Sequence, residues 1–337
     1  MPSKRGGFEV YRASVGVTTN MKPKATGWIA SNAERLGIDG IWIGEDIDLG
    51  QDVFVLTAAT LVQAPKARVG TAIIPVTVHS IQTLARAAVT LYQTGGGRFV
   101  FGTGIGGIQD LKSLGISLMK PVSELRRSVS VLRRLWAGET VTVESELIQL
   151  KDFDVGLKKP VDIPVFLGVR GPQMLKLTGQ VADGVILSGP FDYLKDAVKK
   201  LNKAAEDSGR SPKDIEKVAW LPTIPSFEGS DEGLARRVVA LVVADMPSQV
   251  IDLLDVDKQR VTRIREAVAK SGPSAGSPFV NQEITDMFSI SGEIEYMVDR
   301  FEVLAKMGLT EVVLGPPFSG NWRGAMSEVF QEIKKRQ

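Results

Sequence analysis

Two adjacent carboxylates, Glu45 and Asp46, directly follow the apolar segment 38–44, which reads as a buried strand. A carboxylic acid at the end of a strand can donate a proton in a reaction when burial raises its pKa. The alternative is a solvated acidic loop in which Asp52 caps the helix that follows. We favour a chemical role for Asp46, with Glu45 beside it, and expect Asp48 and Asp52 to belong to the loop.

His79 is the only histidine of the chain, and it follows the segment 75–78 on a predicted loop. Because histidine titrates near neutral pH, His79 is a third catalytic candidate, as a proton shuttle. The simpler interpretation is a histidine that caps the helix from Ile81 or meets solvent, and general experience favours it. With no cysteine and one histidine, the sequence excludes disulfides, cysteine nucleophiles and thiolate or histidine-based metal sites. We predict no metal site.

Glycines concentrate after the apolar run 98–101, at Gly102, Gly104, Gly106 and Gly107. Glycine permits positive φ, and it also lets a flat ligand lie against bare backbone. We therefore interpret this segment as one edge of a cofactor site. The same glycines match the GxGxxG pattern of dinucleotide-binding folds, but a lone match is weak evidence. Three strand–helix units precede them, and the next helix is expected only from Ser123, so a Rossmann dehydrogenase is disfavoured.

The elements that must position these residues repeat along the chain. Strands are predicted to begin near residues 10, 39, 68 and 98, about 29 residues apart, with helices between them. Such a period indicates parallel βαβ units with right-handed crossovers. Four more strands are predicted at 163–169, 183–187, 217–224 and 310–314. Eight strands alternating with helices predict a single (β/α)8 TIM barrel, which places active sites at the carboxyl ends of its strands.

We expect one domain over residues 1–337, with an insertion at about 225–290 between strands seven and eight. Within it, helices are predicted at 234–244 and 256–270, followed by a mobile loop at 271–278. A hairpin is predicted over 140–155, where polar and apolar residues alternate. Ser123 is the predicted N-cap of the helix that ends at Trp136.

Composition narrows the possible partners. The chain has 41 basic and 39 acidic residues among its 337, a net charge of +2, which gives no general reason to expect nucleic acid or an anionic membrane surface. Hydrophobic residues make up 43%, yet no apolar run has membrane-spanning length. The start of the chain lacks the apolar region of a secretory signal. We therefore expect a cytoplasmic protein that acts on a small-molecule substrate.

Several motifs, in order and at similar spacing, resemble those of the luciferase-like flavin and deazaflavin oxidoreductases. The branch with the greatest resemblance is the methylenetetrahydromethanopterin reductases, which use coenzyme F420. The motifs that carry this resemblance are GIWI at 40–43, VGTAI at 69–73, the glycine-rich 97–104, LGI at 114–116, KPVS at 120–123, IPVFLG at 163–168, GPQMLK at 171–176 and Asp183-Gly184.

This resemblance implies a luciferase-like barrel that holds F420, or alternatively FMN, at its mouth. It implies a non-proline cis peptide between Ala72 and Ile73 that forms a bulge behind the ring, and it aligns Asn20 with a family asparagine. The implied binding residues further along the chain are Gly102, Gly104 and Gly106 for the ring, with Gly168, Val169, Arg170, Gly171, Ser188 and Gly189 for the phosphate and side chain of the cofactor. Helix-start amides with Arg170 nearby suit an anion.

Three positions depart from the reductase pattern. Gly16 stands where the reductases have a glutamate, Asp46 where they have a histidine, and Gly107 where they have an aspartate. The resemblance implies hydride transfer between deazaflavin or flavin and a small organic substrate, as in a methylenetetrahydromethanopterin reductase-like enzyme, and the departures leave a different substrate open. An FMN-dependent luciferase-like monooxygenase and a non-catalytic flavin-binding barrel remain as alternatives. Since the family often dimerises, we expect a homodimer.

Overall fold

The computed structural model describes residues 11–47, 50–225, 232–316, 318 and 320–337, so Asp48 lies outside the described part. The chain divides into two compact units. One contains residues 1–13, 187–199 and 217–337, and the other contains residues 14–186 and 200–216. The predicted organisation as a single domain stays a prediction.

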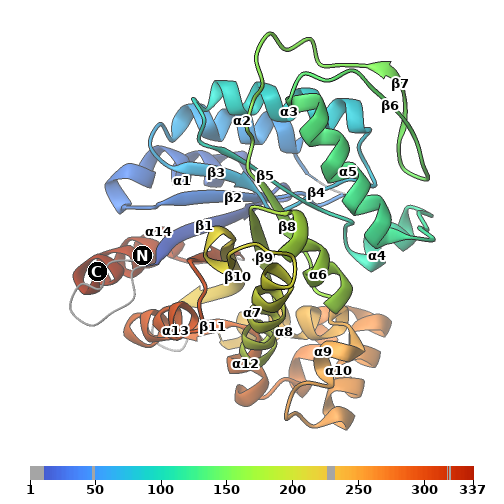
Figure 1. Cartoon of the computed structure of the whole chain (residues 1–337). Coiled ribbons are helices and arrows are strands. Elements are labelled where there is room, and N and C mark those ends of the chain that lie inside the picture. Colours follow the sequence, from blue (N-terminus) through green and yellow to red (C-terminus); the bar gives the residue numbers. More distant parts are fainter. Residues whose placement is uncertain (1–10, 48–49, 226–231, 317, 319) are drawn as a thin grey trace. The chain divides into compact units, whose positions relative to one another are not determined.

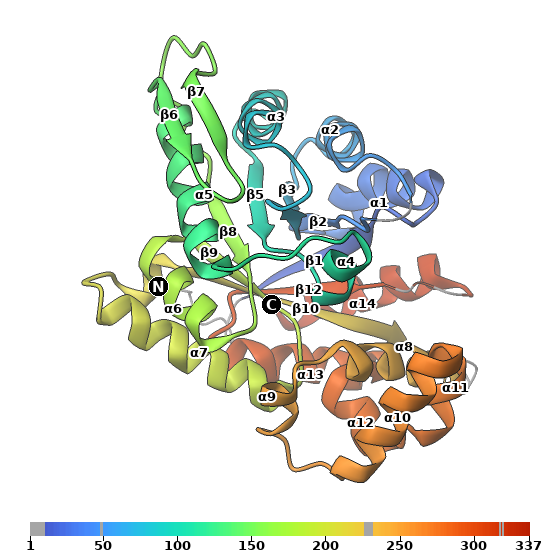
Figure 2. The same ribbon diagram turned by 90° about the vertical axis from the view of Figure 1, so that its right-hand side faces the viewer.

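The unit of residues 14–186 and 200–216 alternates short strands with helices (Figure 1). Helices α1, α2 and α3 lie side by side on one face of their strands (Figures 1 and 2). The elements that begin in this part of the chain are β1 Arg12–Thr18, α1 Pro23–Leu36, β2 Gly40–Gly44, α2 Val53–Gln63, β3 Arg68–Thr71, β4 Ile74–Pro75, α3 Ile81–Thr94, β5 Phe99–Gly104, α4 Ile108–Ser113, α5 Pro121–Trp136, β6 Val141–Glu144, β7 Gln149–Phe153, β8 Val165–Gly168, α6 Pro172–Val181 and β9 Gly184–Leu187.

Local sequence signals set the ends of these helices. Asp52 caps α2 by accepting a hydrogen bond from the Val55 amide, as predicted. Ser80 caps α3 in the same way, through the amide of Thr83. Gly37 ends α1 in the left-handed region, with φ of 77°, where glycine carries no Cβ penalty.

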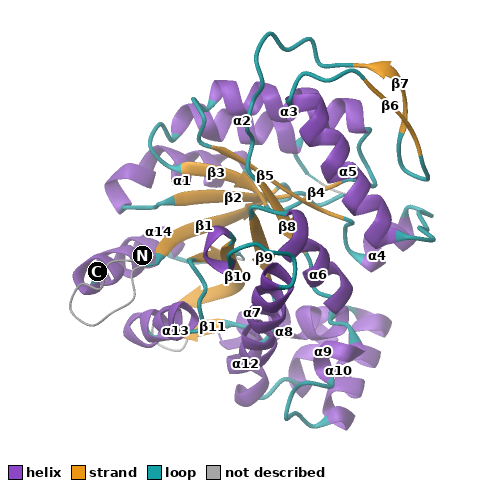
Figure 3. Cartoon of the chain, viewed as in Figure 1, coloured by secondary structure: helices purple, strands orange, loops and turns teal. Residues whose placement is uncertain are grey.

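The other unit holds most of the chain after residue 186, apart from residues 200–216. Its helices α8, α10, α11 and α12 pack on one another and form the insertion between β10 and β12 (Figure 3). The elements from residue 191 onward are α7 Phe191–Glu206, η1 Pro212–Asp214, β10 Glu216–Pro225, α8 Glu232–Asp245, α9 Ser248–Ile251, α10 Lys258–Ser271, α11 Pro273–Gly276, η2 Ser277–Phe279, α12 Gln282–Phe288, β11 Ile290–Gly292, α13 Ile294–Lys306, β12 Glu311–Gly315 and α14 Trp322–Arg336.

The strands form one parallel sheet in the order β10-β12-β1-β2-β3-β5-β8-β9, and β10 also pairs with β9. The sheet is therefore a closed barrel of eight parallel strands with helices between them, and the predicted fold class is confirmed. All eight predicted strands are present. The two-stranded hairpin β6–β7 is antiparallel and pairs separately, as the alternating pattern at 140–155 predicted.

Three expectations about local structure were wrong. The helix assigned to Ser123 begins at Pro121, since proline fits the first helical turn, and no side chain caps it. A short helix, α4, follows Gly107 directly, although no helix was expected before Ser123. The predicted loop 271–278 contains the helical turns α11 and η2, because Pro273 and Pro278 each stand where a helix can start.

The β6–β7 hairpin lies beside α5 (Figure 2), and a buried carboxylate of α5 links the two. Glu124 is 4% exposed, and it accepts hydrogen bonds from the Ser145 hydroxyl at 2.6 Å and the Leu147 amide at 3.1 Å. Glu146, in the turn of the hairpin, accepts the Met119 amide with both of its oxygens. The hairpin is thus bonded both to Met119, in the segment between α4 and α5, and to Glu124 in α5.

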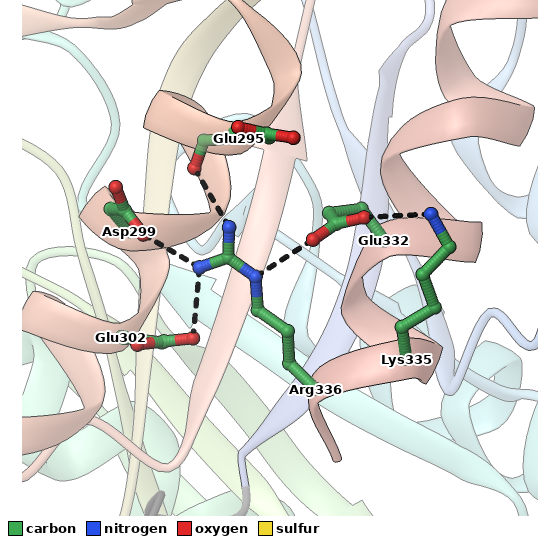
Figure 4. Close-up of polar contacts among 6 residues, drawn as sticks. All are labelled: Glu295, Asp299, Glu302, Glu332, Lys335 and Arg336. Atoms are coloured by element: carbon green, nitrogen blue, oxygen red, sulfur yellow. Dashed lines mark hydrogen bonds and ion pairs between the residues drawn. The ribbon is translucent and has the colours of Figure 1, made fainter.

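Arg336 joins α14 to α13 through a cluster of acidic groups (Figure 4). Its guanidinium lies 2.6 Å from Asp299, 3.2 Å from Glu302 and 2.9 Å from Glu332, and it also bonds the Glu295 carbonyl. These contacts raise the pKa of Arg336 above its ordinary value, with the bond to Asp299 the largest cause. Among the described residues, no helix is long and apolar enough to cross a membrane.

Candidate active site

The three predicted catalytic residues lie in two groups, in the loops that follow β2 and β4. Glu45 pairs with His79, whose Nε2 lies 2.8 and 2.9 Å from the two carboxylate oxygens. Both side chains are largely enclosed, 13% and 21% exposed, and Phe54 of α2 meets the imidazole edge-on. The interpretation of His79 as a helix cap or a solvated residue was therefore wrong, because Ser80 caps α3 and His79 turns to Glu45.

Asp46 faces away from this pair toward the loop after β1. Its carboxylate accepts the Asn20 amide at 3.1 Å, while its own amide donates to the Thr19 hydroxyl at 2.8 Å. Burial raises the pKa of Asp46, and Glu45 adds to the rise; hydrogen bonds from Asn20, Thr18 and Thr19 oppose it. The two neighbouring carboxylates thus have different surroundings, which is typical of sites where one acid handles protons.

Asn20 lies beside Asp46 and contacts it through its backbone amide. Its side-chain oxygen accepts a hydrogen bond of 2.8 Å from the Thr18 hydroxyl. Gln51 ties the same loop to the loop after β2, since its amide nitrogen donates to the Met21 carbonyl at 2.6 Å. The loops after β1 and β2 therefore form one connected surface around Asp46.

The peptide bond between Ala72 and Ile73 is cis, as the resemblance implied. This segment separates β3 from β4, and both residues are partly exposed. The Ala72 amide donates to the Ile43 carbonyl at 2.7 Å, and the Glu45 amide donates to the Ile73 carbonyl at 3.3 Å. The end of β3 is thus fastened to the end of β2, where the acidic residues begin.

The predicted reason for glycine at three of the site positions was incomplete. A Cβ on Gly102 would lie 1.7 Å from the Thr71 carbonyl oxygen. A Cβ on Gly104 or Gly168 would meet the side chain of Ile73, at 2.7 and 2.5 Å. The protein's own Thr71–Ile73 segment therefore fills the space beside these glycines, and Ile73 within it is partly exposed.

The remaining ring-side glycine and the loop after β8 differ from these. Gly106 has φ of 103°, a conformation that favours glycine, and precedes α4. Gly171 caps α6, and a Cβ there would meet no atom within 4 Å. Val169 is buried and Arg170 partly exposed between β8 and this helix start. A helix start such as that of the ten-residue α6 is the kind of place that suits an anion.

Ser188 and Gly189 belong to the other unit, between β9 and α7. Gly189 has φ of 156°, and a Cβ there would lie 2.7 Å from the ring of Tyr193. Of the departures from the reductase pattern, Gly16 is buried in β1 opposite Trp42, and Gly107 is partly exposed just before α4. Sequence reasoning missed Thr71, for which a threonine at the end of a strand was the available signal.

Comparisons with known proteins agree with this architecture. A family model described as luciferase-like monooxygenase matches residues 4–311. The 5,10-methylenetetrahydromethanopterin reductase of Methanolobus tindarius is 29% identical over 309 residues, which cover 90% of this chain and 94% of the relative. The solved coenzyme F420 dependent tetrahydromethanopterin reductase of Methanopyrus kandleri superposes with a TM-score of 0.88 at 25% identity, covering 98% of this chain and all of that one.

A second solved structure, an F420-dependent secondary alcohol dehydrogenase with an F420-acetone adduct, has a TM-score of 0.78 at 18% identity, covering 97% of this chain and 99% of that one. At that identity the likeness concerns the fold. The family model covers most of the chain, and the resemblance found in the sequence motifs is confirmed. The chain belongs to the luciferase-like monooxygenase family.

Proposed function

We propose that this protein is an oxidoreductase that binds coenzyme F420 and transfers a hydride between the deazaflavin and a small organic substrate. The observation that carries the proposal is the Ala72–Ile73 segment, partly exposed and fastened beside Glu45 and Asp46 at the strand ends. An apolar surface next to an acid of raised pKa suits a flat redox ring whose reaction consumes or releases a proton. The relatives named above support F420 as the ring.

The residues present fit such a group. Ile73 offers an apolar face, and the start of α6 at Gly171 with the cation of Arg170 suits an anion after β8. We assign Gly102, Gly104, Gly106, Gly168 and Val169 to the backbone surface around that face, and Ser188 and Gly189 to the cofactor's side chain. When bound, F420 supplies the hydride chemistry, and the protein supplies orientation and proton handling.

Within this proposal the acidic residues have separate tasks. Asp46 holds or releases a proton at its carboxylate, since burial favours the neutral form. Glu45 stays engaged with His79 and orders the loop after β2. The first substrate to test is the methylenetetrahydromethanopterin named in the relatives, although Gly16, Asp46 and Gly107 replace polar or ionisable family residues.

The experiment is a parallel fluorescence titration of the purified protein with F420, FMN and NADPH. Micromolar or tighter binding of F420 alone supports the proposal. Preference for FMN would favour the second candidate, a luciferase-like monooxygenase, which the family model's description makes the natural alternative. Binding without turnover on any substrate would favour a non-catalytic barrel, and binding of NADPH alone would contradict the cofactor assignment.

We also propose that the protein is a homodimer in the cytoplasm, with α2 in the interface. Val55 and Val62 lie two turns apart on one face of this helix and are 69% and 66% exposed. The helix carries no charged residue, so its outer face suits a second copy better than water. Light scattering should give twice the chain mass of 36.4 kDa, and V55K/V62K should give the monomer.

A further inference from the structure

The pairing between β3 and β5 is interrupted next to the proposed ring surface. Gly70 pairs with Val100, and the register resumes with Ile74 opposite Thr103. Residues 71–73 therefore lie opposite residues 101–102, one residue more on the first side. We call this extra-residue segment the Thr71–Ile73 bulge. Bulges commonly sit beside active sites, where they redirect a side chain.

A side chain takes the place of the missing backbone pairing. The Thr71 hydroxyl accepts the Gly102 amide at 2.9 Å and donates to the Gly102 carbonyl at 2.7 Å. Thr71 is fully buried, so neither group of Gly102 has water as an alternative partner for these bonds. One hydroxyl thus satisfies both the donor and the acceptor of the facing residue.

The bulge is also held from its other side. Its Ala72 amide donates to the carbonyl of Ile43 in β2, and its Ile73 carbonyl accepts the amide of Glu45, which directly follows β2. Beyond it, the Thr103 hydroxyl donates to the Ile74 carbonyl at 2.7 Å, where pairing has resumed. The Thr71 hydroxyl is consequently the link between the bulge and β5 at the point where the ladder is broken.

We propose that Thr71 is a positioning residue that, through its hydroxyl bridge to Gly102, sets the place of Ile73 and so the affinity for the cofactor ring. This inference rests on the proposed function, because Ile73 is there the surface against the ring. The side chain of Ile73 extends over Gly104 and Gly168. A shift of the bulge relative to β5 would therefore move Ile73 relative to these two glycines. Thr71 itself touches no cofactor in this scheme.

The test compares Thr71→Val with Thr71→Ser and with the control Thr60→Val. Valine matches threonine in shape but removes both hydrogen bonds, whereas serine keeps the hydroxyl. Thr60 is 2% exposed and bonds only within α2, to the Leu56 carbonyl at 2.8 Å. The readouts are the Kd for F420, measured by fluorescence, and the melting temperature of each variant.

We expect Thr71→Val to weaken F420 binding about tenfold, while Thr71→Ser keeps the wild-type Kd. Thr60→Val should lower the melting temperature and leave the Kd unchanged, which separates positioning from stability. Wild-type binding together with an equally tight Thr71→Val would overturn the assignment of Thr71 alone. If Thr71→Val does not fold, a tenfold loss in the folded Thr71→Ser would overturn it, since the hydroxyl is retained. If wild-type protein binds no F420, the proposed function fails and this inference fails with it.

Discussion

His79, in the loop after β4, pairs with Glu45, in the loop after β2: its Nε2 lies 2.8 and 2.9 Å from the two carboxylate oxygens. The pair links the only imidazole of the protein to one of two neighbouring acids and leaves the other acid in different surroundings. Both side chains are mostly enclosed, so the pair contributes to stability as well as to the arrangement of the site.

Removing one partner of this pair should destabilise the fold. His79→Ala or Glu45→Ala alone should lower the free energy of unfolding by about 1–3 kcal/mol, because the remaining group loses its partner in a partly buried setting. The double variant should lose less than the sum of the two single losses. Urea unfolding of the four proteins measures this coupling. Strict additivity would show that the two side chains do not interact.

Asp46→Asn tests the surroundings of the second acid through the pH dependence of stability. The pKa of Asp46 is raised in the fold, so above pH 3.8 there is a range in which the folded protein keeps a proton that the unfolded chain has released. The free energy of unfolding therefore falls as pH rises through this range. Asparagine has no charge to bury, and its side-chain oxygen can still accept the hydrogen bond from the Asn20 amide. We expect Asp46→Asn to melt higher than wild type at pH 7, with the difference shrinking toward pH 4. A difference that is constant between pH 4 and pH 8 would contradict the raised pKa.

Gly102→Ala should be among the most damaging small substitutions in the molecule. The new Cβ would lie 1.7 Å from a backbone oxygen, which no side-chain rotation can relieve. We expect a loss of more than about 4 kcal/mol in the free energy of unfolding. Gly233→Ala is the matched control, because a Cβ at this exposed position in α8 would meet nothing within 4 Å. Equal stabilities for the two variants would show that the bulge can move freely away from β5.

Arg336→Ala should loosen the contact between α13 and α14. Arg336 has three carboxylate partners, and its side chain is 22% exposed, so its loss should cost about 1–2 kcal/mol, more than an isolated surface pair. Lys335→Ala removes a single exposed ion pair with Glu332 and should be nearly neutral. Thermal unfolding in low and high salt measures both. A loss for Lys335→Ala as large as that for Arg336→Ala would contradict a special role of the network.

The sequence predicted the barrel well because its signals are local and repeated. A buried strand followed by a helix recurs every 29 residues or so. The capping role of Asp52 was predictable because it directly precedes Val53, the first residue of α2. The prediction for Ser123 was wrong because Pro121, a stronger helix-start signal, lies two residues earlier.

The site was harder to predict, since its contacts join residues far apart in sequence. Glu45 and His79 are 34 residues apart, and Thr71 and Gly102 are 31 apart. Neither pair follows from a spacing rule, because each depends on which strands are neighbours and on the extra residue between β3 and β4. Glycine richness correctly indicated close approach at 102–104, but it could not tell that the approaching group was the protein's own chain.

The carboxylate of Glu124 gives the β6–β7 hairpin an unusual kind of dependence. The hairpin supplies the Ser145 and Leu147 partners of one oxygen of this buried group, while the other oxygen lies 3.5 Å from Arg127 of α5 itself. A relative that joined α5 to β8 by a plain loop would keep the Arg127 ion pair but lose both hydrogen bonds from the hairpin. A glutamate at position 124 is therefore better satisfied in homologues that have the excursion between α5 and β8 than in those that lack it.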